Sequence, residues 1–125
     1  MIAHPRILLI DDDEVLLVLV RNFLVEEGFE ILSTADGPQG IEIYKDKRPD
    51  VVILDLALPS MNGLEVLKKI REFDGEARVL VVSGYSSSES REVAFRYGAR
   101  DVIVKPFDPP RLVEALKMLL SGLPA

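Results

Sequence analysis

Short apolar runs alternate along this chain with longer segments of helical periodicity, and few folds are compatible with that pattern. Five runs rich in Val, Ile and Leu occur at residues 7–10, 29–32, 51–54, 79–82 and 102–104, of which 29–32 is the weakest. Continuous runs of this kind predict strands that are buried on both faces, as in a parallel sheet. Their alternation with helices predicts an α/β fold, a doubly wound five-stranded parallel sheet of (βα)5 order with right-handed crossovers.

The segments between the runs carry the marks of helices. In the first segment, five apolar residues follow the spacing of one helix face: Leu16, Leu19, Val20, Phe23 and Leu24. Gly28 stands where the C-terminal cap of that helix is expected. Asp36 and Asp108 are candidate N-caps of the second and fifth helices. The third helix is expected from about Leu64, and a capping-box pattern at residues 86–89 opens the fourth.

Length and composition limit the class of protein. The chain has 125 residues, of which 48% are hydrophobic, so a single domain spanning residues 1–125 is expected. A net charge of −6 without any basic run argues against direct binding of nucleic acid. No apolar run approaches the roughly 20 residues of a membrane span, and no secretory signal is evident. There is no cysteine, which excludes disulfides and thiolate chemistry. These features favour a cytoplasmic protein.

Polar and charged residues directly follow four of the predicted strands. Asp11 and Asp12 follow the first run, Asp55 the third, Ser83 the fourth and Lys105 the fifth. In doubly wound sheets, ligands bind beyond the carboxyl ends of the strands, so these side chains should converge at one edge. Each residue alone could be an ordinary helix cap or turn residue. Their joint placement favours a common site.

Such a site would have a definite chemistry. Three crowded carboxylates need either protons or a cation, and an all-oxygen site without His or Cys suits Mg²⁺ or Mn²⁺. The cation would neutralise charge on an incoming phosphoryl group. Lys105 would add a second positive charge, and the Ser83 hydroxyl a hydrogen bond. Asp55 could then attack as a carboxylate nucleophile and become an aspartyl phosphate.

The sequence resembles the receiver domain of bacterial two-component response regulators, from about Arg6 to Leu120. The matching motifs are Ile7-Leu8-Leu9-Ile10-Asp11-Asp12-Asp13, Pro49-Asp50-Val51-Val52-Ile53-Leu54-Asp55-Leu56, Leu58-Pro59-Ser60-Met61-Asn62-Gly63, Ser83-Gly84, Gly98-Ala99-Arg100-Asp101 and Lys105-Pro106-Phe107. The resemblance implies a flavodoxin-like fold with strand order 2-1-3-4-5. It also implies a signalling switch in a phosphorelay, with weak self-phosphorylation from small donors and slow autodephosphorylation, rather than a metabolic enzyme.

The resemblance further implies a phosphoryl donor and a set of ligands. The donor would be a histidine kinase or a histidine phosphotransfer protein, and Asp55 resembles the phosphoacceptor. Asp11 and Asp12 resemble the metal-binding acids, with Asp12 the more direct ligand. Asp55 and the backbone carbonyl of Ala57 would complete the protein's ligands to Mg²⁺.

The fourth and fifth strand ends resemble the switch region of the family, with one departure. Ser83 resembles the hydroxyl that turns toward the phosphoryl group, and Lys105 the lysine that pairs with it. The Lys105–Pro106 peptide is expected to be cis. Many receivers carry Tyr or Phe where this chain has Val102, so the usual coupling between hydroxyl and aromatic ring is in question. Tyr85 either takes part in the readout or is an ordinary loop aromatic.

Two surfaces are candidates for protein partners. The first predicted helix carries a second apolar stripe, on which Val15 and Val18 either help to dock the phosphoryl donor or pack under neighbouring loops. Val25 and Asn22 fall on or near the same stripe. Receivers often dimerise or contact an output domain through the face from the fourth helix to the fifth. Candidates on that face are Phe95, Arg91 and Arg96.

Two other functions are compatible with parts of the sequence. The stretch from Asp11 to Val15 also fits the D-x-D-x-[TV] pattern of haloacid-dehalogenase-like phosphatases, with Asp11 as nucleophile and Asp13 as acid/base. Against this, the chain is short for that fold, no acidic pair follows Lys105, and Asp55 would have no role. The second alternative is a receiver-like interaction module that is never phosphorylated, which the departure at Val102 keeps open.

Overall fold

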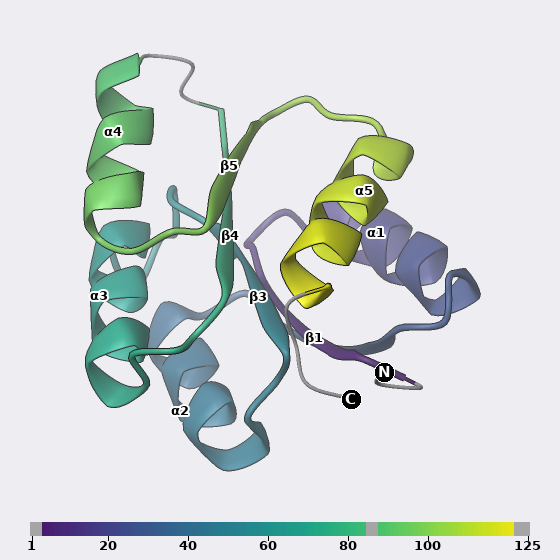
Figure 1. Cartoon of the computed structure of the whole chain (residues 1–125), viewed down its shortest axis with the longest axis horizontal. Coiled ribbons are helices and arrows are strands. Elements are labelled where there is room, and N and C mark those ends of the chain that lie inside the picture. The colour runs from purple at the N-terminus through teal and green to yellow at the C-terminus, as the bar shows by residue number, and fades with distance from the viewer. Residues whose placement is uncertain (1–3, 85–87, 122–125) are drawn as a thin grey trace.

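The computed structural model describes residues 4–84 and 88–121. Five strands and five helices alternate along them (Figure 1). The strands are β1 (Arg6–Ile10), β2 (Glu30–Thr34), β3 (Val51–Asp55), β4 (Val79–Ser83) and β5 (Asp101–Val104). The helices are α1 (Glu14–Glu26), α2 (Gly37–Lys47), α3 (Gly63–Phe73), α4 (Ser88–Arg96) and α5 (Pro109–Leu120). All five apolar runs therefore form strands, and every segment between them contains a helix.

The strands form one parallel sheet in the order β2-β1-β3-β4-β5. This confirms the predicted fold class and strand order. The order reverses next to β1, whose two neighbours are β2 and β3, so the chain winds outward in both directions from this strand. In such sheets the reversal point marks where ligands bind, beyond the carboxyl ends of β1 and β3.

Helices cover both faces of the sheet, with α1 and α5 on one face and α2, α3 and α4 on the other (Figure 1). Each face has its own apolar core because successive strand residues point to opposite sides. In β1, Ile7 and Leu9 pack toward α1 and α5, while Leu8 and Ile10 pack toward the other three helices. The central strands are buried on both sides, which is why their sequences are continuously apolar.

Polar side chains fix the starts of most helices. Asp13, Asp36, Asn62 and Asp108 each cap a helix by accepting a hydrogen bond from a backbone N–H of its first turn. The predicted caps at Asp36 and Asp108 are thus confirmed. Gly28 follows the C-cap of α1 with φ +97°, a conformation that favours glycine. The capping box expected at 86–89 lies partly outside the described residues.

The face assignment of α1 was wrong at one residue. Leu19 was expected in the core but is 62% exposed, whereas Val20 and Leu24 are buried and Leu17 packs beside them. At about 100° per residue, Leu19 lies roughly 100° from Val20 and falls outside the buried arc. Val15 and Val18 are also exposed, so they do not pack under neighbouring loops.

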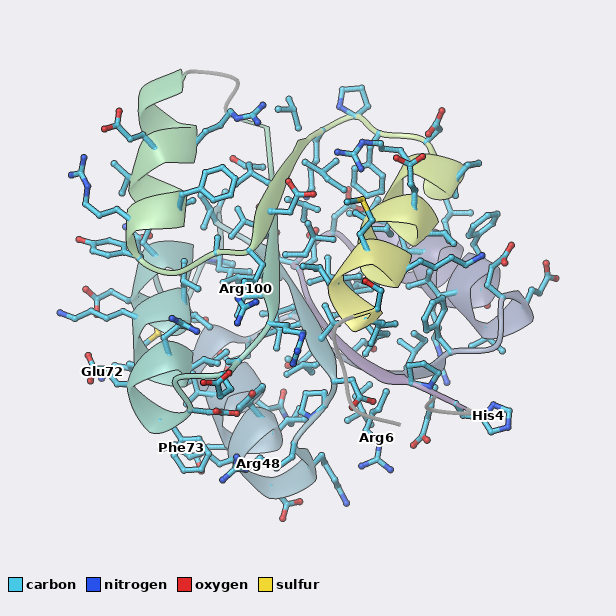
Figure 2. The ribbon with its side chains drawn as sticks, viewed as in Figure 1. His4, Arg6, Arg48, Glu72, Phe73 and Arg100 are labelled. Carbon is cyan, nitrogen blue, oxygen red and sulfur yellow. The ribbon has the colours of Figure 1, made fainter. Side chains whose placement is uncertain are left out.

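The ends of α2 and α3 meet at the edge of the sheet opposite the strand carboxyl ends. There Tyr44 is buried and its hydroxyl donates to Asp74 Oδ2 at 2.7 Å. The Arg48 guanidinium stacks on the ring of Phe73, 4.6 Å from its centroid, and the two side chains are seen together in Figure 2. These contacts join α2 to α3 far from the predicted site. In the described part of the chain, every helix is too short or too polar to cross a membrane.

Candidate functional site

The predicted site residues meet at one edge of the sheet. Asp11 and Asp12 follow β1, while Asp55 and Ser83 are the last residues of β3 and β4. Lys105 follows β5. Because all the strands are parallel, their carboxyl ends share this edge. Ser83 and Lys105 are joined there by a hydrogen bond from the Lys105 backbone N–H to the Ser83 carbonyl at 2.8 Å. The sequence prediction that these residues converge is confirmed.

Asp55 lies at the centre of the cluster with only 5% of its surface exposed. Its Oδ1 accepts a hydrogen bond from the Ala57 backbone N–H at 3.1 Å. Its Oδ2 accepts one from the Lys105 ammonium, also at 3.1 Å. Both carboxylate oxygens are therefore oriented, one by the loop after β3 and the other by the residue after β5.

Asp11 is fully buried and is held in a similar way. Its Oδ2 accepts from Lys105 Nζ at 2.8 Å, and its Oδ1 accepts from the backbone N–H of Asp13 at 2.9 Å. Burial raises the pKa of Asp11 above its ordinary value, against the lowering effect of the hydrogen bond from Lys105. The charged form of Asp11 is thus costly in the absence of further positive charge.

Lys105 is the basic residue that bridges these two acids. Burial disfavours its charged form, but the hydrogen bonds and charges of Asp11 and Asp55 outweigh that cost and raise its pKa above the ordinary value. The ammonium therefore stays charged throughout the physiological range. The Lys105–Pro106 peptide is cis, as expected.

The three carboxylates could together hold a divalent cation. Asp11, Asp12 and Asp55 each offer one oxygen, and these three oxygens lie within 4.8 Å of one another. Two of the acids are buried, whereas Asp12 is exposed. Three negative charges against one lysine leave an excess of two, which a divalent cation would balance. An oxygen-only donor set favours Mg²⁺ or Mn²⁺, so the residues fit the expected metal.

Asp13 takes no part in this cluster. Its Oδ1 accepts hydrogen bonds from the backbone N–H groups of Val15 and Leu16, both at 3.1 Å, as the N-cap of α1. The phosphatase alternative needs Asp13 as an acid/base and Asp11 as a nucleophile. Here Asp13 serves the helix start, and both oxygens of Asp11 already have partners.

Gly63 supports the site, a role that was not predicted from the sequence. Its N–H donates to the Leu56 carbonyl at 3.0 Å, which closes the loop that follows Asp55. A Cβ at this position would lie 2.3 Å from Leu56 Cα and 2.6 Å from the Asp55 carbonyl oxygen. Only glycine lets the start of α3 approach β3 so closely. The Asn-Gly pair before a helix was the available signal.

Val102 occupies the position on β5 where many receivers carry an aromatic residue. Val102 is buried on β5 in the core that also contains Ala94 of α4. A hollow of about 440 Å³ lies over this part of β5, and Arg91 and Arg111 are among its lining residues. Tyr85 falls outside the described residues. Phe95 and Arg96, on the same helix as Arg91, are exposed.

The structure is thus a doubly wound parallel sheet with three carboxylates and one lysine gathered at the carboxyl ends of β1, β3 and β5. The sequence matches the family model of the response regulator receiver domain over residues 7–117. The chain therefore belongs to the response regulator receiver family, whose members are signalling switches of two-component systems.

Individual relatives agree with this assignment. The chain is 38% identical to the chemotaxis protein CheY of Bacillus subtilis over 120 residues, which cover 95% of this chain and 99% of that protein. A CheY-like receiver domain from Methanospirillum hungatei superposes with a TM-score of 0.90 at 30% identity, covering 94% of each chain. A CheX–CheY–BeF₃–Mg²⁺ complex from Borrelia burgdorferi has a TM-score of 0.88 at 30% identity, covering 93% of this chain and 89% of that one.

Proposed function

We propose that this chain is a working phosphoacceptor receiver in which Asp55 takes a phosphoryl group in a Mg²⁺-dependent reaction. The observation that carries the proposal is the Lys105 ammonium bound to both Asp55 and Asp11 beside a third carboxylate, Asp12. A structural role alone does not need three acids close together at the reversal point of the sheet, only two of which pair with the lysine. The BeF₃ and Mg²⁺ in the CheY complex from Borrelia burgdorferi support an anion and a divalent cation in such a site.

The donor would be a phosphohistidine of a histidine kinase or a histidine phosphotransfer protein. A carboxylate oxygen of Asp55 forms a bond to phosphorus while the bond from phosphorus to the imidazole nitrogen breaks, and the electron pair of that bond stays on the imidazole. Bound Mg²⁺ supplies charge neutralisation for the phosphoryl oxygens. It would be held by Asp11, Asp12, Asp55 and the backbone carbonyl of Ala57.

The chain's own groups position this reaction. The Ala57 N–H fixes the plane of the Asp55 carboxylate, and the loop held by Gly63 keeps that N–H in place. Lys105 donates to a phosphoryl oxygen once Asp55 is phosphorylated, because its ammonium already lies 3.1 Å from Asp55 Oδ2. Ser83, at the adjacent strand end, supplies a hydroxyl. Positioned charges of this kind stabilise the transition state without covalent chemistry of their own.

The phosphorylated state would bias a surface of the domain rather than yield a product. Residues 1–125 form a single receiver domain in this proposal, located in the cytoplasm, with slow autodephosphorylation that resets it. The face from α4 to α5 is the candidate output surface, for a second copy or an output domain. Because Val102 replaces the usual aromatic residue, the signal would reach that face through Ser83 rather than through a rotating ring.

Mass spectrometry of the intact protein tests the proposal. The full chain is incubated with acetyl phosphate, with and without Mg²⁺, as wild type and as Asp55→Ala. A gain of one phosphoryl group that needs Mg²⁺ and is absent from Asp55→Ala is expected. No gain under any condition would favour the unphosphorylated interaction module. A gain that persists in Asp55→Ala would instead indicate a nucleophile such as Asp11.

A further inference from the structure

A hollow of about 330 Å³ lies between α3 and α4, on the face of the sheet opposite α1 and α5 (Figure 1). Its volume is at the lower end of the range of small-molecule sites, roughly 300–1,000 Å³. The residues that line it are Lys68, Arg71, Glu72, Arg96, Tyr97 and Gly98. The hollow is separate from the Asp55 cluster, which lies at the ends of the strands that precede these helices.

The hollow is positively charged in a domain that is acidic overall. Three of its six lining residues are basic and one is acidic, whereas the whole chain has a net charge of −6. Arg96 pairs with Glu92 at 3.1 Å. In the described part of the chain, neither Lys68 nor Arg71 forms an ion pair with a carboxylate. Two cations therefore line one hollow without a paired counter-charge, and such an arrangement attracts anions.

Arg71 is held in place by the backbone rather than by an acid. Its Nη1 donates to the carbonyls of Gly75 and Ala77 in the connection between α3 and β4. Among the described residues, the Nε–Nη2 edge of the guanidinium has no hydrogen-bond partner, and such an edge matches two oxygens of a phosphate or carboxylate. Gly98 keeps this edge uncovered, because a Cβ there would lie 2.5 Å from Arg71 Nε.

Helix dipoles account for only part of this cluster. Arg71 and Arg96 lie in the last turns of α3 and α4, where basic residues complement the dipole. Lys68 lies five residues before the end of α3, beyond the reach of that effect. The Tyr97 ring is 43% exposed and directly follows α4. It adds a flat aromatic surface beside the cations, and proteins bind nucleobases by stacking them on such rings.

We propose that the hollow between α3 and α4 binds a nucleoside monophosphate, with its phosphate on Lys68 and Arg71 and its base on the Tyr97 ring. A phosphate monoester carries about two negative charges at neutral pH, which matches two cations without paired carboxylates. Inorganic phosphate or a dicarboxylate would satisfy the cations but leave the ring exposed. A nucleoside alone would cover the ring but leave the cations unpaired. A nucleoside monophosphate satisfies both.

Charge and size disfavour macromolecular occupants. Glu72 borders both this hollow and a neighbouring one of about 310 Å³ between α2 and α3. It lies on the outer side of α3 (Figure 2), so it would repel an acidic protein segment that ran across α3 from one hollow to the other. A nucleic acid strand would meet a domain of net charge −6, which opposes binding of a polyanion. A small ligand confined to one hollow avoids both penalties.

Amide NMR of the full chain tests the assignment. The ¹⁵N-labelled protein, in EDTA, is titrated separately with adenosine monophosphate (AMP), adenosine and inorganic phosphate. We expect saturable shifts at residues 68–72 and 96–98 with AMP, weakened by added salt, and at least tenfold weaker binding of the other two probes. Equal binding of AMP and inorganic phosphate, no shifts at millimolar AMP, or shifts confined to the surroundings of Asp55 would each overturn the proposal.

Two variants separate the phosphate contacts from the base contact. Lys68→Gln/Arg96→Gln changes two exposed residues, leaves Arg71 to hold its loop, and should weaken AMP at least tenfold. Tyr97→Ser should reduce the affinity for AMP to that for inorganic phosphate. Lys45→Gln/Lys117→Gln is the matched control, because it removes the same charge from exposed positions outside the hollow. Equal weakening by both double variants would mean a general charge effect and overturn the site.

Further readouts identify the occupant and separate this proposal from phosphorylation. Asp55→Ala should bind AMP as wild type does, and loss of binding in this variant would place the nucleotide at the acidic cluster instead. A Glu-rich peptide that shifts the same amides at lower concentration than AMP would show an acidic protein segment as the occupant. Either result overturns the proposal. Failure of acetyl phosphate to phosphorylate the chain would sink the proposed function and leave the AMP result unchanged.

Discussion

The Lys105 ammonium lies 2.8 Å from Oδ2 of Asp11, a residue 94 positions earlier in the chain. The same ammonium lies 3.1 Å from Asp55 Oδ2, so one cation compensates two buried carboxylates. Asp12 adds a third negative charge with no lysine of its own in the cluster. The metal-free site is therefore short of positive charge, and both its stability and its chemistry should respond to any change in that balance.

Lys105→Met should expose this dependence. The substitution keeps much of the apolar stem but leaves Asp11 and Asp55 without their cation, so we expect a loss of about 1–3 kcal/mol in the free energy of unfolding at neutral pH. Mg²⁺ should restore part of that loss by mass action, giving a larger Mg²⁺-induced rise in Tm than in wild type. Thermal unfolding with EDTA and with Mg²⁺ measures both effects. Lys117→Met, at an exposed position of α5, is the matched control and should change little.

Asp11→Asn should act in the opposite direction in the absence of metal. It removes a buried negative charge, while its side-chain carbonyl can still accept from the Asp13 N–H. We expect the metal-free protein to gain about 1 kcal/mol, or roughly 4 °C in Tm, and to lose the stabilisation by Mg²⁺. A metal-free Tm that is unchanged or lower than that of wild type would count against a crowded acidic pocket.

The pH dependence of that gain follows from the raised pKa of Asp11. Because the folded pKa lies above the unfolded value of 3.8, ionisation of Asp11 is harder in the folded state. Wild type is therefore penalised as pH rises from the unfolded pKa through the folded one. The advantage of Asp11→Asn should be full at neutral pH and should vanish below about pH 3.8. Urea unfolding with EDTA across this range gives the measurement.

Much of the site could be predicted because its signals are local. A run such as residues 51–54 predicts a buried strand, and a parallel sheet brings every strand end to one edge, so Asp55 and Lys105 could be placed together without coordinates. The role of Gly63 could not be predicted in this way, because it depends on how closely α3 approaches the backbone of β3. Leu19 was misassigned because a helix face is set by the packing of its neighbours as well as by spacing.

The contact between Tyr44 and Asp74 could not be predicted either. The two residues are 30 positions apart in the sequence and lie at the ends of two different helices. The Tyr44 hydroxyl lowers the pKa of the Asp74 carboxyl below its ordinary value, with smaller contributions from a backbone N–H and two arginines. Burial, with the nearby charge of Asp74, raises the pKa of Tyr44. The hydroxyl therefore remains a donor across the accessible pH range.

Tyr44→Phe should remove a stabilisation that depends on pH. A folded pKa below the unfolded one stabilises the fold above the unfolded pKa, and this contribution is lost as pH falls through the folded value. We expect a loss of about 1–2 kcal/mol at pH 7 that shrinks below pH 3.8. Urea unfolding of both proteins tests the difference, and carboxyl NMR should show a higher pKa of Asp74 in the variant. A difference that is constant with pH would mean that Asp74 is not the relevant partner.

Gly63→Ala should damage the site through the backbone alone. The added methyl would meet Leu56 Cα and the Asp55 carbonyl, and neither can rotate away as a side-chain end could. The loop between Asp55 and Gly63 must therefore shift, at a cost of about 1–3 kcal/mol. The shift should also weaken the hydrogen bond from Ala57 N–H to Asp55 and slow phosphorylation by acetyl phosphate at least tenfold. Thermal unfolding and intact mass over time measure the two effects.

Gly75→Ala provides the matched control for this substitution. A Cβ at Gly75 would meet nothing within 4 Å, and its φ lies outside the left-handed region, so the same chemical change should be harmless there. Equal phosphorylation rates in Gly63→Ala and Gly75→Ala would show that close approach of α3 to β3 does not position Asp55. The rates are compared at saturating Mg²⁺ and at a temperature where both variants are folded. A slow rate in Gly63→Ala under these conditions would indicate that the Asp55 carboxylate is misoriented. Weakened metal binding alone would be overcome by the excess metal.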